Sequence, residues 1–280
     1  MARIRVVTDS ACDLSGELAA ERGLTIVPLS IRFGSEEFVD GSTLSTDDFW
    51  ARCAASSILP ETSAPSPGAF QEAFVAAADD GYDGVLSLSL SAGVSATYQA
   101  AVAAAKAVGD RIPVRTVDSR SMTMGQGLMA LDLAELAAAG ATLDQLADRA
   151  DHLIPRTSVF GAVDTLEHLE KGGRIGGARA LLGSLLSIKP VVTLVDGVVA
   201  EESKQRTRGR SMRYLADKAK EAPPLSRLAV CNGAAADIGE FLEMISGVHS
   251  EHPLVVVDLG PVVGTHTGPG TLGVCMVTAD

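Results

Sequence analysis

Hydroxyl side chains that could hold a ligand gather in a proline-rich loop early in the chain. Thr62 and Ser63 lie in the segment ETSAPSPGAF, residues 61–70, just before a helix that should begin at Pro67. Ser66 is the natural N-cap of that helix, because its hydroxyl can accept a hydrogen bond from the first turn. Thr62 is not needed for capping, so its hydroxyl is available either to a ligand or to solvent.

A second hydroxyl-rich loop leads from an expected strand into an expected helix. The segment SLSLSAGVSATYQAA, residues 87–101, offers Gly93, Ser95 and Thr97 where the helix should begin. The unpaired backbone N–H groups of a helix start attract a carboxylate or a phosphate without a cationic side chain. Ser95 can also be interpreted as the N-cap of the helix, and the two roles are compatible because a capping hydroxyl can touch a ligand.

The same loop contains an incomplete nucleophile elbow, the turn that carries the reactive serine of many hydrolases. The pattern G-x-S-x-G requires a small last residue, and Thr97 stands in that place here. Such an enzyme also needs a histidine later in the chain, for which His266 in the segment VVGTHTGPG is the candidate. One hypothesis is therefore an esterase or acyl transferase that uses Ser95 and His266. The other interpretation of His266 is a structural histidine in a loop.

Two segments carry arginines that could face an anion or a partner. Residues 170–190 (EKGGRIGGARALLGSLLSIKP) form a glycine-rich turn around Arg174, followed by an expected amphipathic helix. Residues 204–210 (KQRTRGR) hold four cations, among them Arg206, in a chain whose net charge is −12. This cluster indicates either a local positive patch for a phosphate or an acidic protein surface, or an ordinary solvated face. The letters GPGTLG match a dinucleotide-binding motif, but a strand-like run follows them, so we reject that interpretation.

The elements that position these loops alternate between strands and helices. In the first half this alternation favours βαβ units and a mainly parallel sheet. In the second half Asp196-Gly197 predicts a type I′ hairpin turn between strands 190–195 and 198–200, and hence a mixed sheet. The other expected strands are 3–8, 24–31, 84–90, 112–117, 158–163, 227–231, 254–258 and 272–278. The expected helices are 14–21, 46–56, 67–78, 95–108, 122–139, 165–170, 178–186, 211–220 and 237–246.

Length and composition narrow the class of protein. A chain of 280 residues predicts about two domains, which we place at 1–155 and 156–280 on either side of Ile154-Pro155-Arg156. The negative net charge argues against a nucleic-acid or anionic membrane surface. Four widely spaced cysteines without a C-x-x-C pair are typical of thiols in a reducing compartment. The sequence shows neither a secretory signal nor an apolar run long enough to span a membrane, so we expect a cytoplasmic protein with no integral membrane association.

Taken together, the motifs resemble those of the DegV family. The resemblance runs nearly end to end, through VVTDSACDL, VPLSIRF, ETSAPSPGAF, LSLSAGVSATYQ, TVDSRSMTMGQG, LEKGGRIGGARALLGSLLSIKP and GPVVGTHTGPGTLG. It implies two α/β domains that clasp one long-chain fatty acid, such as palmitate or oleate, between them. It also implies a non-catalytic protein similar to the lipid-binding subunit of bacterial fatty-acid kinase. That subunit presents the carboxyl group to a separate ATP-dependent kinase subunit, and the acyl phosphate formed feeds phospholipid synthesis.

The resemblance also implies roles for individual residues. Thr62 and Ser95 correspond to the hydroxyls that hold the fatty-acid carboxylate, and the histidine matching His266 lies nearby. Arg174 and Arg206 correspond to positions that support engagement of the kinase. Three further residues are expected to support the pocket: Ser63, Gly93 and Thr97. Ala96 departs from the glycine usual in the family, which makes the turn beside the carboxylate bulkier.

Elementary chemistry agrees with a lipid ligand. A cleft lined by Leu, Val, Ala and Met buries an acyl tail at about 0.8 kcal/mol per CH₂. Neutral hydroxyls and a helix start satisfy a carboxyl group without burying a cation. No motif in the sequence indicates a metal site, a nucleotide site or a cofactor other than the fatty acid itself. A lipid sensor or store without a kinase partner would need the same pocket, so the sequence leaves that alternative open.

Overall fold

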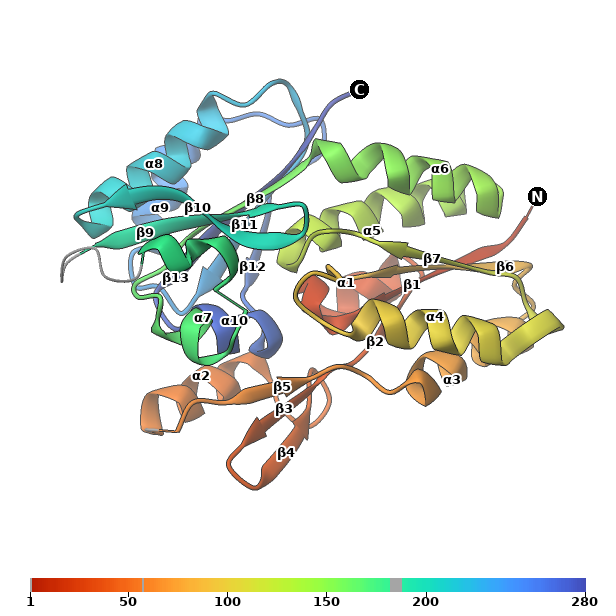
Figure 1. The fold of residues 1–280 in the computed structure, drawn as a ribbon. Coiled ribbons are helices and arrows are strands. Elements are labelled where there is room, and N and C mark those ends of the chain that lie inside the picture. Colours follow the sequence, from red (N-terminus) through yellow and green to blue (C-terminus); the bar gives the residue numbers. More distant parts are fainter. Residues whose placement is uncertain (1, 57, 182–187) are drawn as a thin grey trace.

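The computed structural model describes residues 2–56, 58–181 and 188–280, and within them the strands form three sheets (Figure 1). The N-terminal sheet is entirely parallel, in the order β2-β1-β6-β7. Its strands are β1 (Ile4–Asp9), β2 (Leu24–Val27), β6 (Gly84–Ser89) and β7 (Val114–Asp118). The parallel sheet expected in the first half of the chain is confirmed.

Helices cover both faces of this sheet because its strands are apolar on both sides. Val7 and Val85 face α3 (Pro67–Asp79) and α4 (Thr97–Val108), whereas Val6 and Leu86 face α5 (Thr123–Ala138). α6 (Leu143–Leu153) lies beside α5, and α1 (Gly16–Glu21) packs against β2. Such double cover is what a buried parallel sheet requires.

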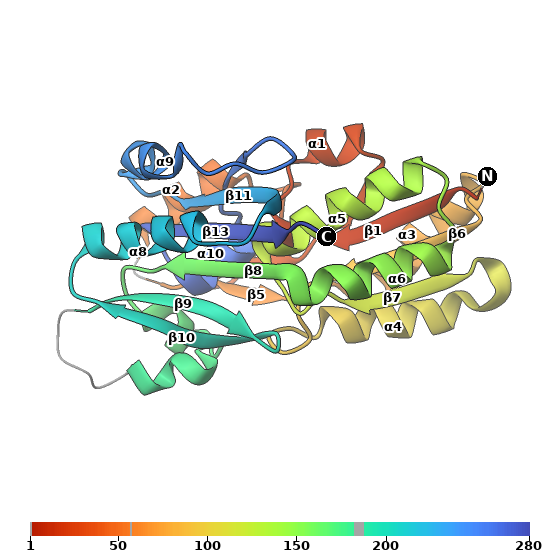
Figure 2. The ribbon, with the colours of Figure 1, turned by 90° about the horizontal axis from the view of Figure 1, so that it is seen from above.

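The C-terminal sheet is mixed, as predicted, with the order β10-β9-β8-β13-β11-β12. Only β11 and β12 pair in parallel, and β13 lies between β8 and β11 (Figure 2). α8 (Arg208–Lys220) and α9 (Ile238–Ile245) cover one face. The strands are β8 (Thr157–Ala162), β9 (Lys189–Val195), β10 (Val198–Gln205), β11 (Leu225–Gly233), β12 (Val255–Asp258) and β13 (Thr271–Thr278).

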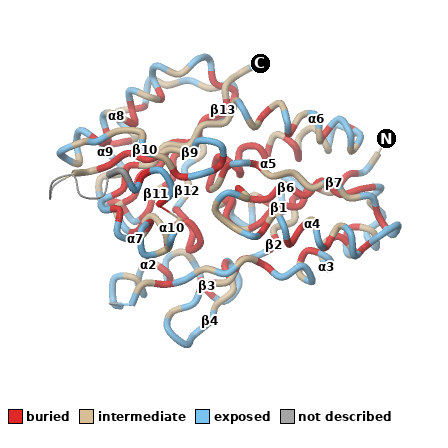
Figure 3. Tube along the Cα trace, viewed as in Figure 1, coloured by how far each residue is buried: buried red, intermediate tan, exposed pale blue. Residues whose placement is uncertain are grey.

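α5 joins the two large sheets. It packs along β1 on one side and meets β11 and β13 with its first turns. All residues from Thr123 to Leu131 are buried, including the polar Thr123 and Gln126, so this part of the helix has no exposed face (Figure 3). A helix that is buried all round is typical of the centre of a large core. The sheets are therefore held to each other by a shared helix.

The third sheet is small, antiparallel and was not predicted. It has the order β4-β3-β5 and stands with α2 (Thr46–Ala55) beside α10 (Pro261–Thr267). Its strands are β3 (Ser30–Phe33), β4 (Glu36–Val39) and β5 (Glu61–Ser63). The single strand expected over 24–31 is accordingly wrong, because the chain passes from β2 in the parallel sheet into β3 of this one.

The N-cap, the hairpin turn and the short helices agree with the predictions in part. The N-cap Ser66 is confirmed, as is the type I′ turn, with φ of 49° at Asp196 and 77° at Gly197. The helices α6 and α10 were missed. α7 (Glu167–Lys171) matches the helix expected near it, but the next segment is a 3₁₀ turn, Gly176–Leu181. The rest of the helix expected over 178–186 lies outside the described residues.

Candidate functional site

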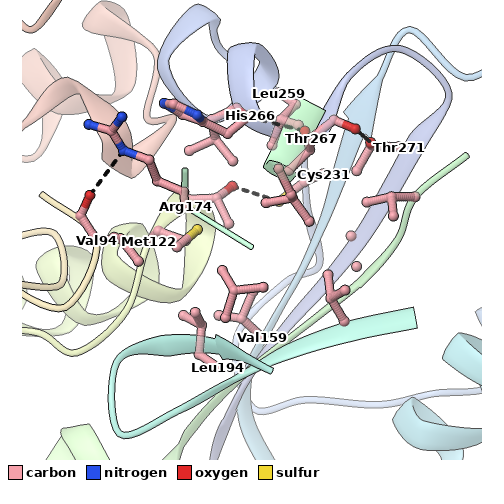
Figure 4. A pocket seen from close by; sticks show the side chains of 18 of the residues that line it. Val94, Met122, Val159, Arg174, Leu194, Cys231, Leu259, His266, Thr267 and Thr271 are labelled. Carbon is pink, nitrogen blue, oxygen red and sulfur yellow. Dashed lines mark hydrogen bonds between the residues drawn. The ribbon is translucent and has the colours of Figure 1, made fainter. Parts of the chain in front are cut away.

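A cavity lies where the carboxyl ends of the parallel strands meet the C-terminal sheet (Figure 4). Counted with its open mouth, it encloses about 800 Å³ of empty space. Its wall is mainly aliphatic, and it draws on the loops after β6 and β7, on the C-terminal strands and on α10. The apolar side chains are those of Leu90, Val94, Met122, Val159, Phe160, Val163, Leu169, Val192, Leu194, Val199, Leu259, Val262 and Val263.

A histidine stands at the polar side of this cavity. His266 is on the last turn of α10 rather than in a loop, and its Nε2 lies 2.9 Å from Thr62 Oγ1 on β5. Its Nδ1 is buried and has no hydrogen-bond partner among the residues that the structure describes. Burial, together with the nearby charges of Arg174 and His168, lowers the pKa of His266 to about 4. The imidazole is therefore neutral at pH 7.

Arg174 lies beside His266 in the cavity wall. The guanidinium donates from Nε to Val94 O (3.3 Å) and from Nη1 to Gly172 O (2.8 Å), and so links the glycine-rich turn to the loop after β6 (Figure 4). Gly172 packs directly on the imidazole, because a Cβ at that position would lie 2.4 Å from His266 Nδ1. The turn can approach the histidine this closely only with glycine there.

The loop that carries Ser95 is organised by its own hydroxyls. Ser95 Oγ lies 2.9 Å from Thr97 Oγ1 and accepts a hydrogen bond from Thr97 N at 3.3 Å. Ser95 as the N-cap is wrong by one residue, since α4 begins at Thr97 after Ala96. Ala96 has φ of −82°, which any L-residue adopts, so the departure from glycine strains nothing in the backbone.

At position 93 the packing of the loop requires a glycine. A Cβ there would lie 2.8 Å from Gly197 O, at the tip of the β9–β10 hairpin. The hydroxyl of Ser91, in the same loop, donates to that carbonyl at 2.7 Å. The loop after β6 is thus fastened to the hairpin, which fixes Val94 in the cavity wall.

The structure brings some of the predicted residues together and leaves others apart. Thr62 and His266 are hydrogen-bonded, and Arg174 shares the cavity wall with His266. Ser63 is exposed at the end of β5. Arg206 is exposed between β10 and α8, away from the cavity lining.

The basic cluster around Arg206 is partly neutralised. Arg208 makes a bidentate pair with Asp237, both contacts at 2.8 Å, and Lys204 lies 3.5 Å from Glu201. Fewer of the four cations therefore face solvent unpaired than the sequence suggested.

The pairing required of a serine hydrolase is not assembled. Ser95 bonds within its own loop to Thr97, while His266 bonds to Thr62. The arrangement instead gives an apolar wall with a neutral hydroxyl–imidazole pair at one side. Sequence reasoning missed Thr123, Cys231 and Thr271, which also line the cavity. Nothing in their local sequence patterns signals this, because tertiary packing alone brings them there.

Comparison with known proteins decides the family. The family described as "Uncharacterised protein, DegV family" matches residues 3–279. The chain belongs to the DegV family. A DegV domain-containing protein of Streptomyces coelicolor is 37% identical over 278 residues, 97% of each chain.

Solved structures of DegV proteins share the whole fold. One from Thermus thermophilus, described as "Fatty Acid Binding of a DegV family Protein", aligns with a TM-score of 0.89 at 31% identity, over 99% of this chain and 100% of that one. One from Eubacterium ventriosum, described as a stearic acid-binding protein, aligns with a TM-score of 0.86 at 27% identity, over 99% and 98% of the two chains. Fatty acids are thus ligands of DegV family proteins.

The described residues contain neither a candidate membrane-spanning helix nor a candidate metal-binding cluster. No helix within 2–56, 58–181 and 188–280 has the length and apolarity to cross a bilayer. In the same ranges no three His, Cys, Asp or Glu side chains come together as a metal site would require.

Proposed function

We propose that this protein binds one long-chain fatty acid, such as palmitate or oleate, in the cavity beside His266. The observation that carries the proposal is the combination of an aliphatic wall with a neutral hydroxyl–imidazole pair at its polar side. The wall would bury the acyl tail at about 0.8 kcal/mol per CH₂. Relatives described as fatty-acid-binding support it.

The carboxylate would be held by Thr62, Ser95 and His266. The Thr62–His266 bond uses one of the two polar hydrogens of this neutral pair and leaves the other to donate to the carboxylate, and burial makes that bond stronger than it would be in water. A carboxylate beside the ring would raise the pKa of His266 and offset the lowering by Arg174. Ser95 would turn its hydroxyl from Thr97 to the ligand. Three more residues would support the pocket: Ser63, Gly93 and Thr97.

We further propose that the protein presents this carboxyl group to a separate ATP-dependent kinase subunit in the cytoplasm. The acyl phosphate would supply phospholipid synthesis. This chain would not itself be catalytic. Arg206 and Arg174, one exposed and one at the edge of the cavity, would contact the kinase. The lipid would lie between two domains, 1–155 and 156–280. A lipid sensor or store is the alternative if no kinase acts on the bound ligand.

Native mass spectrometry of the purified protein tests the binding step. We expect a stoichiometric fatty acid, identified after denaturation, or uptake of added palmitate or oleate. Thr62→Ala and Ser95→Ala should lose the ligand, whereas Ser15→Ala, at the exposed cap of α1, should retain it. A protein that stays empty with both lipids would overturn the proposal. Turnover of a short-chain chromogenic ester that is lost in Ser95→Ala would then favour a hydrolase.

The presentation step needs a different readout. Arg206→Ala should bind palmitate as wild type does but lower acyl-phosphate formation when the kinase and ATP are present. Arg210→Ala is the matched control, because it removes an exposed cation four residues away. Arg174→Ala should affect both steps, since Arg174 also lines the cavity. Equal acyl-phosphate formation by Arg206→Ala and wild type would remove Arg206 from the kinase contact.

A further inference from the structure

Two buried cysteines face each other across the neighbouring strands β11 and β13. The Sγ atoms of Cys231 and Cys275 are 3.9 Å apart. Cys231 pairs in register with Gly273, and Cys275 pairs with Ala229, so the two thiols occupy diagonal positions on one face of the sheet. A Cβ on Gly273 would lie 3.2 Å from Cys231 Cβ. The absence of a side chain there leaves room for the Cys231 thiol to turn toward Cys275.

The first turn of α5 points at both sulfurs. The backbone N–H of Met124 hydrogen-bonds to Cys231 and that of Gly125 to Cys275. α5 is a 16-residue helix, and the positive end of its dipole favours a thiolate over a thiol. Gly125 permits this approach, because a Cβ there would lie 2.4 Å from Val159 Cγ2. The same surroundings lower the pKa of reactive cysteines in other proteins.

A hydroxyl links Cys231 to a buried carboxyl group. Thr123 Oγ1 lies 3.2 Å from Cys231 Sγ and donates to Asp13 Oδ2 at 2.5 Å. Asp13 is fully buried, which raises its pKa and makes the carboxylate a strong proton acceptor. A proton can therefore pass from the Cys231 thiol to Thr123 as the proton of Thr123 passes to Asp13.

The backbone at this link is strained. Thr123 has φ of 47°, a left-handed conformation that is a genuine outlier for a β-branched residue. Strain of this kind persists where the surroundings enforce it and is concentrated at functional sites. Here it brings the Thr123 hydroxyl within reach of both the sulfur and the carboxyl group.

The two sulfurs also differ from each other. The hydrogen bond from Cys275 lowers the pKa of Cys231, whereas burial raises the pKa of Cys275. Cys231 and Thr123 border the cavity, although Cys231 is itself fully buried, whereas Cys275 is not among the lining residues. A small oxidant in the cavity therefore meets Cys231 first.

We propose that Cys231 and Cys275 form a peroxide-reactive dithiol, in which Cys231 attacks and Cys275 resolves. The Cys231 thiolate attacks hydrogen peroxide, the O–O bond breaks, and sulfenic acid and hydroxide form; the hydroxide takes up the thiol proton as water. The Cys275 thiol then displaces water from the sulfenic acid and closes a disulfide. The sulfurs approach from 3.9 Å to about 2.05 Å, which draws Cys231 away from Thr123 and alters the cavity wall.

The test is oxidation by hydrogen peroxide in a Cys53→Ser background. Cys53 is half-buried, and its replacement prevents it from forming disulfides between molecules. No Lys or Arg follows Arg227, so trypsin leaves both cysteines in one peptide, residues 228–280. We expect that peptide to lose two hydrogen masses, reversibly with dithiothreitol, while Cys12 stays reduced. In Cys275→Ser, Cys231 should instead be trapped as sulfenic acid by a dimedone probe. In Cys231→Ser, Cys275 should stay reduced.

The rates of oxidation by peroxide should differ between Cys231 and Cys53. In the wild-type chain Cys231 should react with peroxide faster than Cys53, because the pKa of Cys231 is lowered whereas burial raises the pKa of Cys53 to about 11. Thr123→Val, which breaks the link to Asp13, should slow Cys231 and leave Cys53 unchanged. A peptide 228–280 that keeps its mass while Cys53 oxidises would overturn the proposal, as would equal rates at Cys231 and Cys53.

Occupancy of the cavity adds a consequence that rests on the proposed function. A bound palmitate tail should shield Cys231, so that the palmitate-loaded protein forms the disulfide more slowly than the lipid-free protein. Palmitate binding is measured separately by native mass spectrometry. Binding without disulfide formation would remove the dithiol and leave the lipid site intact. Disulfide formation in a protein that binds neither palmitate nor oleate would remove the lipid site and leave the dithiol intact.

Discussion

A single methyl group at Gly172 should disable the proposed carboxylate site. The Cβ of Gly172→Ala would lie 2.4 Å from His266 Nδ1 and 2.9 Å from His168 O. A normal van der Waals contact requires about 3.5 Å, so the imidazole must move by about 1 Å. The backbone itself tolerates alanine, because Gly172 has φ of −74°. The clash therefore falls on the imidazole ring and, to a smaller extent, on the His168 carbonyl.

That displacement is enough to break a hydrogen bond. Thr62 Oγ1 and His266 Nε2 are 2.9 Å apart, and a further 1 Å exceeds the limit for a side-chain hydrogen bond. A buried partner left unsatisfied costs about 1–3 kcal/mol. Palmitate should therefore bind about 5- to 150-fold more weakly to Gly172→Ala than to wild type.

Isothermal titration with palmitate measures this loss, and urea unfolding reports whether the variant is folded. The matched control is Gly177→Ala in the same segment, where a Cβ would meet nothing closer than 3.7 Å. The control should bind as wild type does. If Gly172→Ala is folded and has the dissociation constant of wild type, the position of His266 does not govern carboxylate binding, and the reasoning fails.

Three further predictions follow from other contacts. Thr62→Val should weaken palmitate binding about 5- to 30-fold while Thr62→Ser retains it; equal titrations for the two would exclude a role for the hydroxyl. Burial raises the pKa of Asp9 from 3.8 to about 7. Because the unfolded chain loses this proton at lower pH than the folded one, the free energy of unfolding should fall by up to about 4 kcal/mol as pH rises from 4 to 7. Asp9→Asn should flatten that slope in urea unfolding, and an unchanged slope would contradict the assignment. Gly197→Ala, with φ of 77° and a Cβ that would lie 2.3 Å from Ser91 Oγ, should lower the free energy of unfolding by about 1–3 kcal/mol; an unaltered unfolding midpoint would show that the loop–hairpin contact adds no stability.

The sequence predicted the architecture better than the short elements that carry the proposed site. Alternating strands and helices, the cap at Ser66 and the Asp196-Gly197 turn are local signals, and each is confirmed. β5 has only three residues and exists because Thr62 pairs with Ile31 on β3, a contact that no local pattern records. The loop expected around Thr62 was wrong for that reason.

The helices α6 and α10 were not predicted, for different reasons. α10 is short and contains Gly264, whose missing side chain lets it pack on Phe49 and Trp50; a Cβ there would lie 2.8 Å from each ring. Packing, rather than helix propensity, decides that segment, so sequence reasoning placed His266 in a loop. α6 was predictable, since Thr142 and Gln145 form a complete capping box.

Distances within the site lay beyond any sequence pattern. Thr62 and His266 are separated by 204 positions; the motif resemblance implied that His266 lies near the carboxylate-holding hydroxyls, but not that its Nε2 bonds to Thr62 Oγ1. The sequence around the two cysteines indicated even less about their distance, because an isolated thiol in an apolar run looks the same whether another thiol lies near it in space or far away. Their proximity follows from the strand order of the C-terminal sheet.

The place of β13 in that sheet has a consequence for synthesis on the ribosome. β13 follows every other described strand in the chain yet lies between β8 and β11. Until residues 271–278 emerge from the exit tunnel, β10-β9-β8 and β11-β12 are two fragments with open edges, which invite pairing with other chains. A nascent chain halted before these residues therefore has no finished cavity, and a chaperone that covers β8 or β11 would protect it at its most aggregation-prone stage.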